Sequence, residues 1–158
     1  MARAKKSPNV EPEPKALCDD ALRLFVGYQM KRAFNVMKAD LARVLEPSGL
    51  RMTTYSALVL IDSNPRIRQS ELAQMLAMER PNMVLVLDDL EQGGWITRER
   101  VETDRRAYAL MATLAGKRLC AKLKAANLKA EESRLQHLTS DERRSLTLAL
   151  AGLEGRGD

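Results

Sequence analysis

The stretch QSELAQMLAMERPNMVLVLDDLEQGGWITRERVETDRR, residues 69–106, decides the fold of this chain. It opens with a short amphipathic segment, 69–76, and a second segment, 80–92, follows after only three residues. Two short helices in such close succession are typical of a helix-turn-helix. We expect the apolar members of the first helix to point inward: Leu72, Ala73, Met75 and Leu76.

The second segment contains the run MVLVL at 83–87, which by its period alone fits a buried strand as well as a helix. Its surroundings favour the helix. Pro81 suits a first helical turn, and Gly93-Gly94 suits a helix end. The helix then carries Met83, Leu87 and Leu90 on one face.

The segments 95–101 and 106–111 that follow are rich in residues suited to strands, and 102–105 between them contains turn formers. We therefore expect a β-hairpin. A helix-turn-helix followed by a basic-tipped hairpin predicts a winged helix-turn-helix, so the fold class is mainly α with a small β-hairpin.

Working outward toward the N-terminus, an apolar stripe at helical spacing runs from about Ala16 to Leu45 and predicts a helix of about 30 residues. Thr53 is the expected N-cap of a short helix that ends at Asn64-Pro65. Residues 1–15, with three prolines and no apolar pattern, predict a flexible basic arm.

Working toward the C-terminus, Thr113 is expected to cap a long helix that reaches about His137. Thr139 and Glu142 have capping-box spacing at the start of a last helix. The predicted organisation is the arm at 1–15, an N-terminal dimerisation helix at 16–48, a winged DNA-binding domain at 49–113 and C-terminal dimerisation helices at 114–158.

Composition limits the function classes. The 158 residues allow one compact domain with an extension, and no apolar run approaches the roughly 20 residues of a membrane span, so we expect a cytoplasmic protein. The net charge of +5 suggests a polyanionic partner. Residues 66–106, however, carry seven Arg, no Lys and eight acidic residues, so bulk charge does not locate the binding surface.

The sequence contains few of the residues that catalysis or metal binding requires. Cys18 and Cys120 lie 102 positions apart and form no CxxC pair, so we expect them to be small buried residues. His137 is the single histidine, which disfavours a metal site or a catalytic triad. We expect no enzyme activity, no metal and no cofactor.

The chain resembles the MarR family of bacterial transcription regulators. The motifs that carry the resemblance are QSELA at 69–73, LEQGGWITR at 90–98, Asp104-Arg105-Arg106, and Thr113 followed by Gly116. The resemblance implies a homodimer that binds a pseudo-palindromic operator in double-stranded DNA. Long amphipathic helices at both ends agree with dimerisation, although their leucines could instead serve a bundle within one chain: Leu114, Leu119, Leu123, Leu146 and Leu150.

In this family the second helix of the motif enters the major groove and the wing reaches the minor groove. The resemblance assigns to DNA Arg68, Gln69, Arg80, Pro81, Asn82, Val84, Leu85, Asp104, Arg105 and Arg106. Asn82 is the candidate for a base contact, and Arg106, oriented by Asp104, is the candidate for the minor groove. Val84 and Leu85, where relatives often carry polar residues, either contact thymine methyls or belong to the core.

Many relatives bind a small aromatic acid between the dimer helices and the winged domain. The candidate effector residues combine aromatic and apolar groups with cations: Tyr28, Lys31, Arg32, Phe34, Met52 and Tyr55. They suit an aromatic carboxylate or its CoA thioester, and Lys117, Arg118, Lys122 and Lys124 are candidates for CoA phosphates. The expected function is a repressor released from its operator by such an effector.

Two alternatives remain open from the sequence. The first is a peroxide sensor of the same fold, which Asp19 and Asp20 beside Cys18 disfavour because they discourage a thiolate. The second is a helical interaction module that does not bind DNA. A repressor would show duplex affinity that depends steeply on salt, whereas an interaction module would show none.

Overall fold

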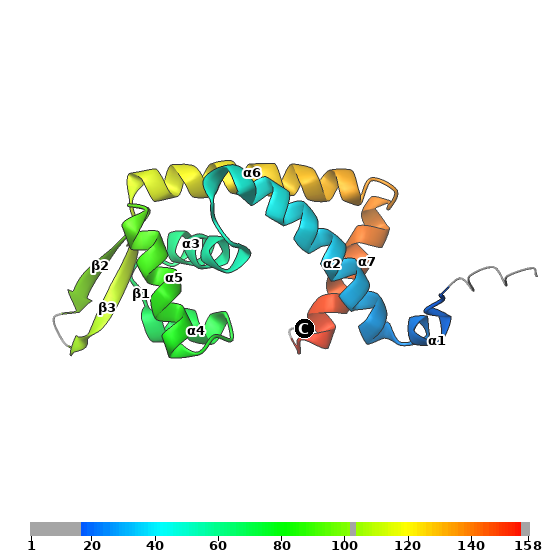
Figure 1. Ribbon diagram of the computed structural model, residues 1–158, viewed down its shortest axis with the longest axis horizontal. Helices are drawn as coiled ribbons and strands as arrows, with labels where there is room; N and C mark the ends of the chain where they lie inside the picture. Colours follow the sequence, from blue (N-terminus) through cyan, green and yellow to red (C-terminus); the bar gives the residue numbers. More distant parts are fainter. Residues whose placement is uncertain (1–16, 102–103, 156–158) are drawn as a thin grey trace, which may run out of the picture. The chain divides into compact units, whose positions relative to one another are not determined.

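The computed structural model describes residues 17–101 and 104–155, with only the backbone at 101 and 104–107 (Figure 1). In chain order the elements are α1 (Asp20–Arg23), α2 (Val26–Leu45), the 3-10 turn η1 (Glu46–Ser48), α3 (Met52–Ser63), β1 (Ile67–Arg68), α4 (Gln69–Met75), α5 (Arg80–Gln92), β2 (Ile96–Val101), β3 (Asp104–Ala112), α6 (Leu114–Arg134) and α7 (Ser140–Leu153). Residues up to Phe34 and residues from Asn35 form two compact units. No helix of the described ranges has the length and hydropathy of a membrane span.

The predicted helix-turn-helix is present as α4 and α5, and α5 has the bounds expected from Pro81 and the double glycine. Its apolar face packs against α3 in one core. The fully buried side chains of that core include Leu58 and Ile61 of α3, Leu72 of α4, and Met83, Leu87 and Leu90 of α5. The helical interpretation of the run at 83–87 is therefore confirmed.

The wing is a three-stranded antiparallel sheet with the strand order β1-β3-β2. The hairpin of β2 and β3 was expected, but β1 was not. Ile67 pairs with Leu110 and Arg68 with Ala109. A two-residue strand has no period that a sequence could reveal, and only the position of β3 beside it makes it a strand.

The end of α5, the wing and the start of α6 meet at Trp95. The Trp95 carbonyl accepts a hydrogen bond from the Thr113 amide at 3.0 Å. The Thr113 hydroxyl donates to the Gly94 carbonyl at 2.7 Å and accepts from the Gly116 amide at 3.0 Å, which caps α6 as predicted. A Cβ on Gly116 would lie 2.0 Å from the Trp95 carbonyl oxygen, so only glycine fits there.

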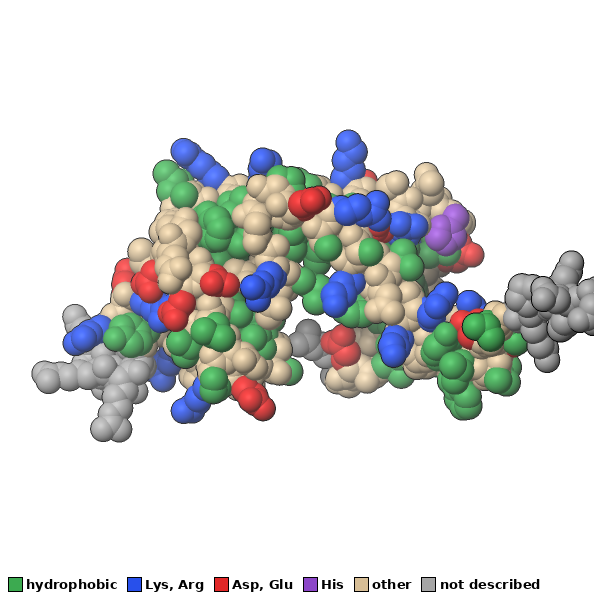
Figure 2. Space-filling model, in the orientation of Figure 1, with side chains coloured by type: hydrophobic (Ala, Val, Ile, Leu, Met, Phe, Trp, Pro, Cys, Tyr) green, Lys and Arg blue, Asp and Glu red, His purple; other side chains and the backbone are tan. Residues whose placement is uncertain are grey.

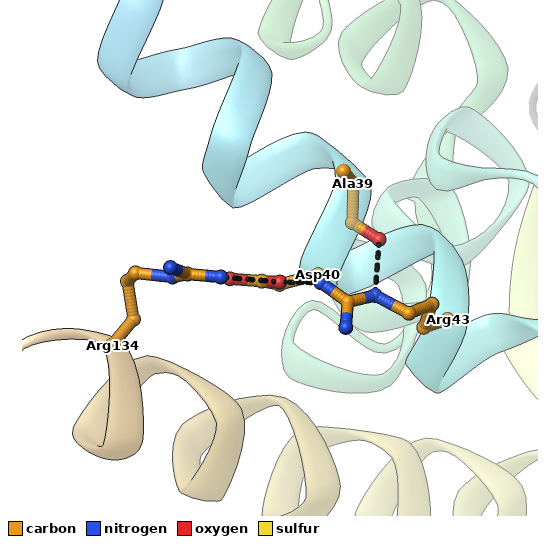
Figure 3. Close-up of polar contacts among 4 residues, drawn as sticks. All are labelled: Ala39, Asp40, Arg43 and Arg134. Carbon is orange, nitrogen blue, oxygen red and sulfur yellow. Dashed lines mark hydrogen bonds and ion pairs between the residues drawn. The ribbon is translucent and has the colours of Figure 1, made fainter.

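In the unit from Asn35 onward, α6 packs on α3 through the buried Cys120 and Leu123 and is also joined to α2. Arg134 of α6 donates to both carboxylate oxygens of Asp40 at 2.7 and 3.0 Å, and Arg43 donates to the same carboxylate (Figure 3). The side chain of Asp40 is only 13% exposed. The Arg134 guanidinium lowers the pKa of Asp40, so this carboxylate stays ionised and holds both arginines.

The single N-terminal helix that the apolar stripe predicted is wrong in one respect. The chain forms α1 and α2, with Leu24 and Phe25 outside the helices. The Asp19 carboxylate accepts hydrogen bonds from the Tyr28 hydroxyl and from Arg23, both at 2.6 Å. These two bonds hold the bend between the helices, which hydrophobic spacing alone does not detect.

Four smaller expectations are also wrong. Helix α3 begins after Arg51, so Thr53 lies inside the helix and not at its N-cap. Met75, the last residue of α4, is 54% exposed and does not point inward. Helix α6 ends at Arg134, before His137. Cys18 precedes α1 and is exposed, whereas Cys120 is buried as expected.

Replacing Gly116 by Ala should destabilise the protein. The added methyl group must push α6 away from the Trp95 carbonyl, and we expect a loss of about 1–3 kcal/mol in the free energy of unfolding. Gly152→Ala in α7 is the matched control, because a Cβ there meets nothing within 4 Å. It should gain about 0.5–1 kcal/mol in urea denaturation, since alanine favours a helix over glycine. Equal stabilities of the two variants would contradict this account.

The two thiols should differ sharply in reactivity. Burial, followed by the nearby Asp62 carboxylate, raises the pKa of the Cys120 thiol to about 11, so this thiol stays protonated at any pH well below that value. We expect iodoacetamide at mildly alkaline pH to modify Cys18 alone in the native protein and both cysteines in urea, as read by mass spectrometry. Equal labelling of Cys120 in the native state would be inconsistent with its burial.

Candidate nucleic-acid interface

Helix α5 has two faces of different character. Met83, Val86, Leu87 and Leu90 anchor one face in the core. The other face is exposed, and it is apolar where most helix surfaces are polar: Val84 is 39% and Leu85 65% exposed. The structure thus excludes the interpretation of Val84 and Leu85 as core residues. It leaves them free to contact an external partner.

Polar groups of the motif gather where α4 and α5 begin. Arg80, Pro81 and Asn82 form the exposed first turn of α5, which contains no acidic residue. A helix N-terminus with free amides favours a phosphate. In Figure 1, α5 starts beside α4 and runs toward the start of α6.

Helix α4 begins without one of the side chains that usually cap a helix N-terminus, Ser, Thr, Asp or Asn. Arg68 stands at the N-cap, where its side chain makes no capping bond. The Glu71 carboxylate instead accepts from the Arg68 amide at 2.8 Å. The Arg68 guanidinium is exposed and forms no ion pair with any acidic side chain that the structure describes, and Gln69 beside it is partly buried.

Arg98 joins the wing to α5. It forms an ion pair with Asp88, and its Nε lies 3.1 Å from a Glu91 carboxylate oxygen without the geometry of a hydrogen bond. Only 17% of the Arg98 side chain is exposed. The sequence reasoning missed this contact. Asp88 and Glu91, three residues apart on one helix face, were the signal that could have revealed it.

A second ion pair closes the base of the sheet. Arg66 donates to Glu99 of β2 at 2.7 Å, and its amide bonds to the Leu110 carbonyl at 3.0 Å. Arg66 has a left-handed backbone with φ of 70°, which bends the chain from α3 into β1. These contacts and Arg98 fix the orientation of the wing relative to α5.

The wing-tip candidates fall partly outside the described residues. The backbone of Asp104, Arg105 and Arg106 belongs to β3, while their side chains lie outside the described part of the chain. Their assignment to DNA therefore stays a prediction.

The candidate effector residues lie on both compact units. Tyr28, Lys31, Arg32 and Phe34 belong to the unit that ends at Phe34, and all but the half-buried Tyr28 are exposed. The bond to Asp19 raises the pKa of the Tyr28 hydroxyl, which thus stays neutral near pH 7. In the other unit, Met52 is half-buried and Tyr55 is buried.

A pocket of about 560 Å³ lies between α2 and α6 in the unit from Asn35 onward. Its lining residues are Asp40, Arg43, Val44, Ala130, Ser133, Arg134 and Gln136. None of the six candidate effector residues belongs to it. Within the described ranges, no cluster of His, Cys, Asp and Glu is suited to a metal ion.

The C-terminal helix α7 exposes an apolar surface. It contains no buried residue, and its large apolar side chains are all exposed: Leu146, Leu148, Leu150 and Leu153. The capping box of Thr139 and Glu142 is present as predicted, with the Glu142 carboxylate 2.7 Å from the Thr139 amide. The intrachain alternative is therefore wrong for Leu114, Leu146 and Leu150, which a single chain leaves exposed. It is confirmed for Leu123, which is buried in the core of its own chain, and for Leu119, which packs against that core.

Figure 2 shows the charged side chains on one face of the molecule, with Lys and Arg along α6 and a mixture of acids and arginines near the wing. On this face, the described surface near α5 thus carries charges of both signs. An interface with a duplex would depend on a few placed groups and on the apolar face of α5, as the charge distribution along the sequence indicated.

Comparison with known proteins places these features in a family. The model of the MarR family matches residues 50–108. A protein of Thauera aromatica described as "Putative transcriptional regulatory protein for hcr operon" is 30% identical over 122 residues, which cover 77% of this chain and 74% of that protein.

Solved structures agree with this relationship. A structure of the transcriptional repressor CouR bound to a 23-mer DNA duplex is 33% identical, with a TM-score of 0.80, and covers 90% of this chain and 100% of that chain. CouR bound to p-coumaroyl-CoA is 31% identical, with a TM-score of 0.78, over 88% and 98% of the two chains. With its winged sheet, its α4-α5 motif and these matches, the chain belongs to the MarR family of transcription regulators.

Proposed function

We propose that the protein is a dimeric, ligand-responsive repressor that binds a pseudo-palindromic operator and acts in the cytoplasm. The observation that carries the proposal is the exposed face of α5, where Asn82, Val84 and Leu85 project from a helix that is anchored in the core. A helix held rigidly on one side and exposed on the other is what a major-groove reader requires.

Dimerisation follows from the uncovered leucines of α7. A second copy of the chain would bury the 39–67% of each leucine that is still exposed, which contributes about 0.6–2 kcal/mol per leucine. A dimer has two α5 helices, one for each half-site of the operator. We expect the centres of the half-sites to be about 34 Å apart, which is one turn of the duplex.

The candidate DNA-binding residues differ in the part of the duplex that their side chains suit. Asn82 offers an amide to a base edge, while Val84 and Leu85 offer apolar contact to thymine methyls. Arg68, Gln69 and Arg80 lie at the helix starts, where their side chains suit backbone phosphates. Pro81 has no N–H to donate, so it would meet the DNA only through apolar contact. Arg106 would enter the minor groove with Asp104 orienting it, and Arg105 would meet a phosphate.

The effector that we propose is an aromatic acid or its CoA thioester. The support is the similarity to CouR, which has been seen with p-coumaroyl-CoA, together with the residue set Tyr28, Lys31, Arg32, Phe34, Met52 and Tyr55. A ligand releases DNA only when it binds better to the form in which the two α5 helices cannot reach both half-sites.

Replacing Arg106 by Ala should weaken operator binding. The variant loses one guanidinium in the minor groove, and we expect affinity to fall by about 1–3 kcal/mol, or roughly 5–150-fold, in a band-shift titration. Arg144→Ala, which removes one exposed guanidinium from α7, should leave affinity nearly unchanged. The minor-groove role of Arg106 would be refuted by equal, slight losses in both variants.

The effector is tested with DNA from the flanks of the gene. We expect p-coumaroyl-CoA or a related aromatic thioester to lower operator affinity by tenfold or more at saturation, equivalent to about 1.4 kcal/mol of coupling. Organic peroxide should have no effect, and Cys18→Ser should respond to the thioester as the native protein does. Release by peroxide that disappears in Cys18→Ser, with no response to any aromatic compound, would instead identify a thiol sensor.

A further inference from the structure

Helix α6 carries an unusual charge distribution. Residues 114–130 contain five cations and no acidic residue: Lys117, Arg118, Lys122, Lys124 and Lys129. All five side chains are exposed, and none makes an ion pair with an acidic side chain in the described part of the chain. We call these five residues the α6 cationic face.

This face lies away from the proposed DNA-reading surface. The buried residues Gly116, Cys120 and Leu123 turn the opposite side of α6 toward the core. In Figure 1, α3 lies between α6 and α4, so α6 and the start of α5 are on opposite sides of the winged domain. Figure 2 shows Lys and Arg side chains projecting outward along α6.

The charges do not stabilise α6 itself. Lys117 lies in the first turn, where the helix dipole disfavours a cation, and Arg118 and Lys122 are like charges four residues apart. Helix α7 differs, because Asp141 and Glu142 stand beside Arg143 and Arg144 in its first turns. Glu132, three residues after Lys129, is exposed on the same side of α6, so the face has a single sign of charge only from Lys117 to Lys129. An external polyanion would neutralise it.

The chemistry of the face favours duplex DNA. Four of its five cations are Lys, which binds phosphate as a point charge, whereas the motif and wing at 66–106 use Arg alone. Residues 114–134 contain no aromatic side chain on which unpaired bases could stack. Two leucines are exposed on the same side of α6, Leu114 and Leu128, but they lie about 21 Å apart along the helix at 1.5 Å per residue. Only Ala121 and Ala125 lie between them beside the cations, so the face lacks the central cluster of large side chains that anchors a protein partner.

The dimensions also suit a duplex. Lys117 and Lys129 are separated by about 18 Å along the helix at 1.5 Å per residue. A duplex presents one negative charge for about every 1.7 Å of its axis, so several phosphates face the five cations at once.

We propose that the α6 cationic face binds a second DNA duplex without sequence preference, so that one protein molecule bridges two DNA segments. This goes beyond the proposed function, on which it rests for the first DNA contact. The second contact consists of phosphate interactions only and should weaken steeply with salt.

The test uses beads that carry a duplex of random sequence and a fluorescent duplex of the same length in solution, at about 50 mM salt. Protein retained on the beads reports the first contact, and captured fluorescence reports the second. The test variant is Lys122→Gln/Lys129→Gln, and Lys38→Gln/Arg144→Gln is the control with the same change in net charge at exposed sites. Glutamine keeps a high helix propensity, so folding is preserved.

We expect the test variant to be retained on the beads as well as the control but to capture about tenfold less fluorescent duplex. The salt slope of capture should fall by about 0.9 for each phosphate interaction that the substitutions remove. Equal capture by the two variants, or retention of native protein without any capture, would overturn the proposal. If no protein is retained at all, the proposed DNA-binding function fails, and with it the bridging that rests on it.

Discussion

The close approach of Gly116 to the Trp95 carbonyl is the contact on which the rest of the structure depends. Trp95 bonds through its amide to Leu90 at the end of α5, and through its carbonyl to Thr113 at the start of α6. Because residue 116 has no Cβ, the first turn of α6 can lie directly on the chain that connects α5 to the wing. One junction therefore sets the directions of α5, of the wing and of α6.

Rigidity at that junction has a functional consequence. Arg98 ties β2 to α5, and the buried Cys120 and Leu123 tie α6 to α3. The winged domain should therefore move as a body with the start of α6. An effector that changes DNA affinity would act by shifting whole winged domains relative to each other, because bending α5 within its domain would break the core contacts of Met83, Leu87 and Leu90.

Two surfaces of the protein carry positive charges of different residue type: Arg alone at 66–106, and mainly Lys on α6. The proposed DNA-reading region, residues 66–106, carries seven Arg, no Lys and eight acidic residues, and it exposes an apolar face at Val84 and Leu85. Such a surface would recognise a DNA sequence through the positions of its side chains and not through its net charge. The α6 cationic face has four Lys, one Arg and no aromatic group, which would attract phosphates without reading the base sequence. The sequence total of +5 conceals this division, because acids near the wing offset its arginines.

The sequence by itself determined the order and nearly all the bounds of the elements from 69 onward. Local rules decide these: Pro81 and Gly93-Gly94 delimit α5, and Thr113 and Thr139 cap α6 and α7. The family motifs also predicted which helix would face DNA. Only the tertiary structure decided that β1 is a strand, that α1 and α2 are separate, that Val84 and Leu85 are exposed, and that Arg98 serves to hold the wing. Each of these depends on a partner distant in the sequence or on a side-chain bond across a bend, and hydrophobic period carries no information about such contacts.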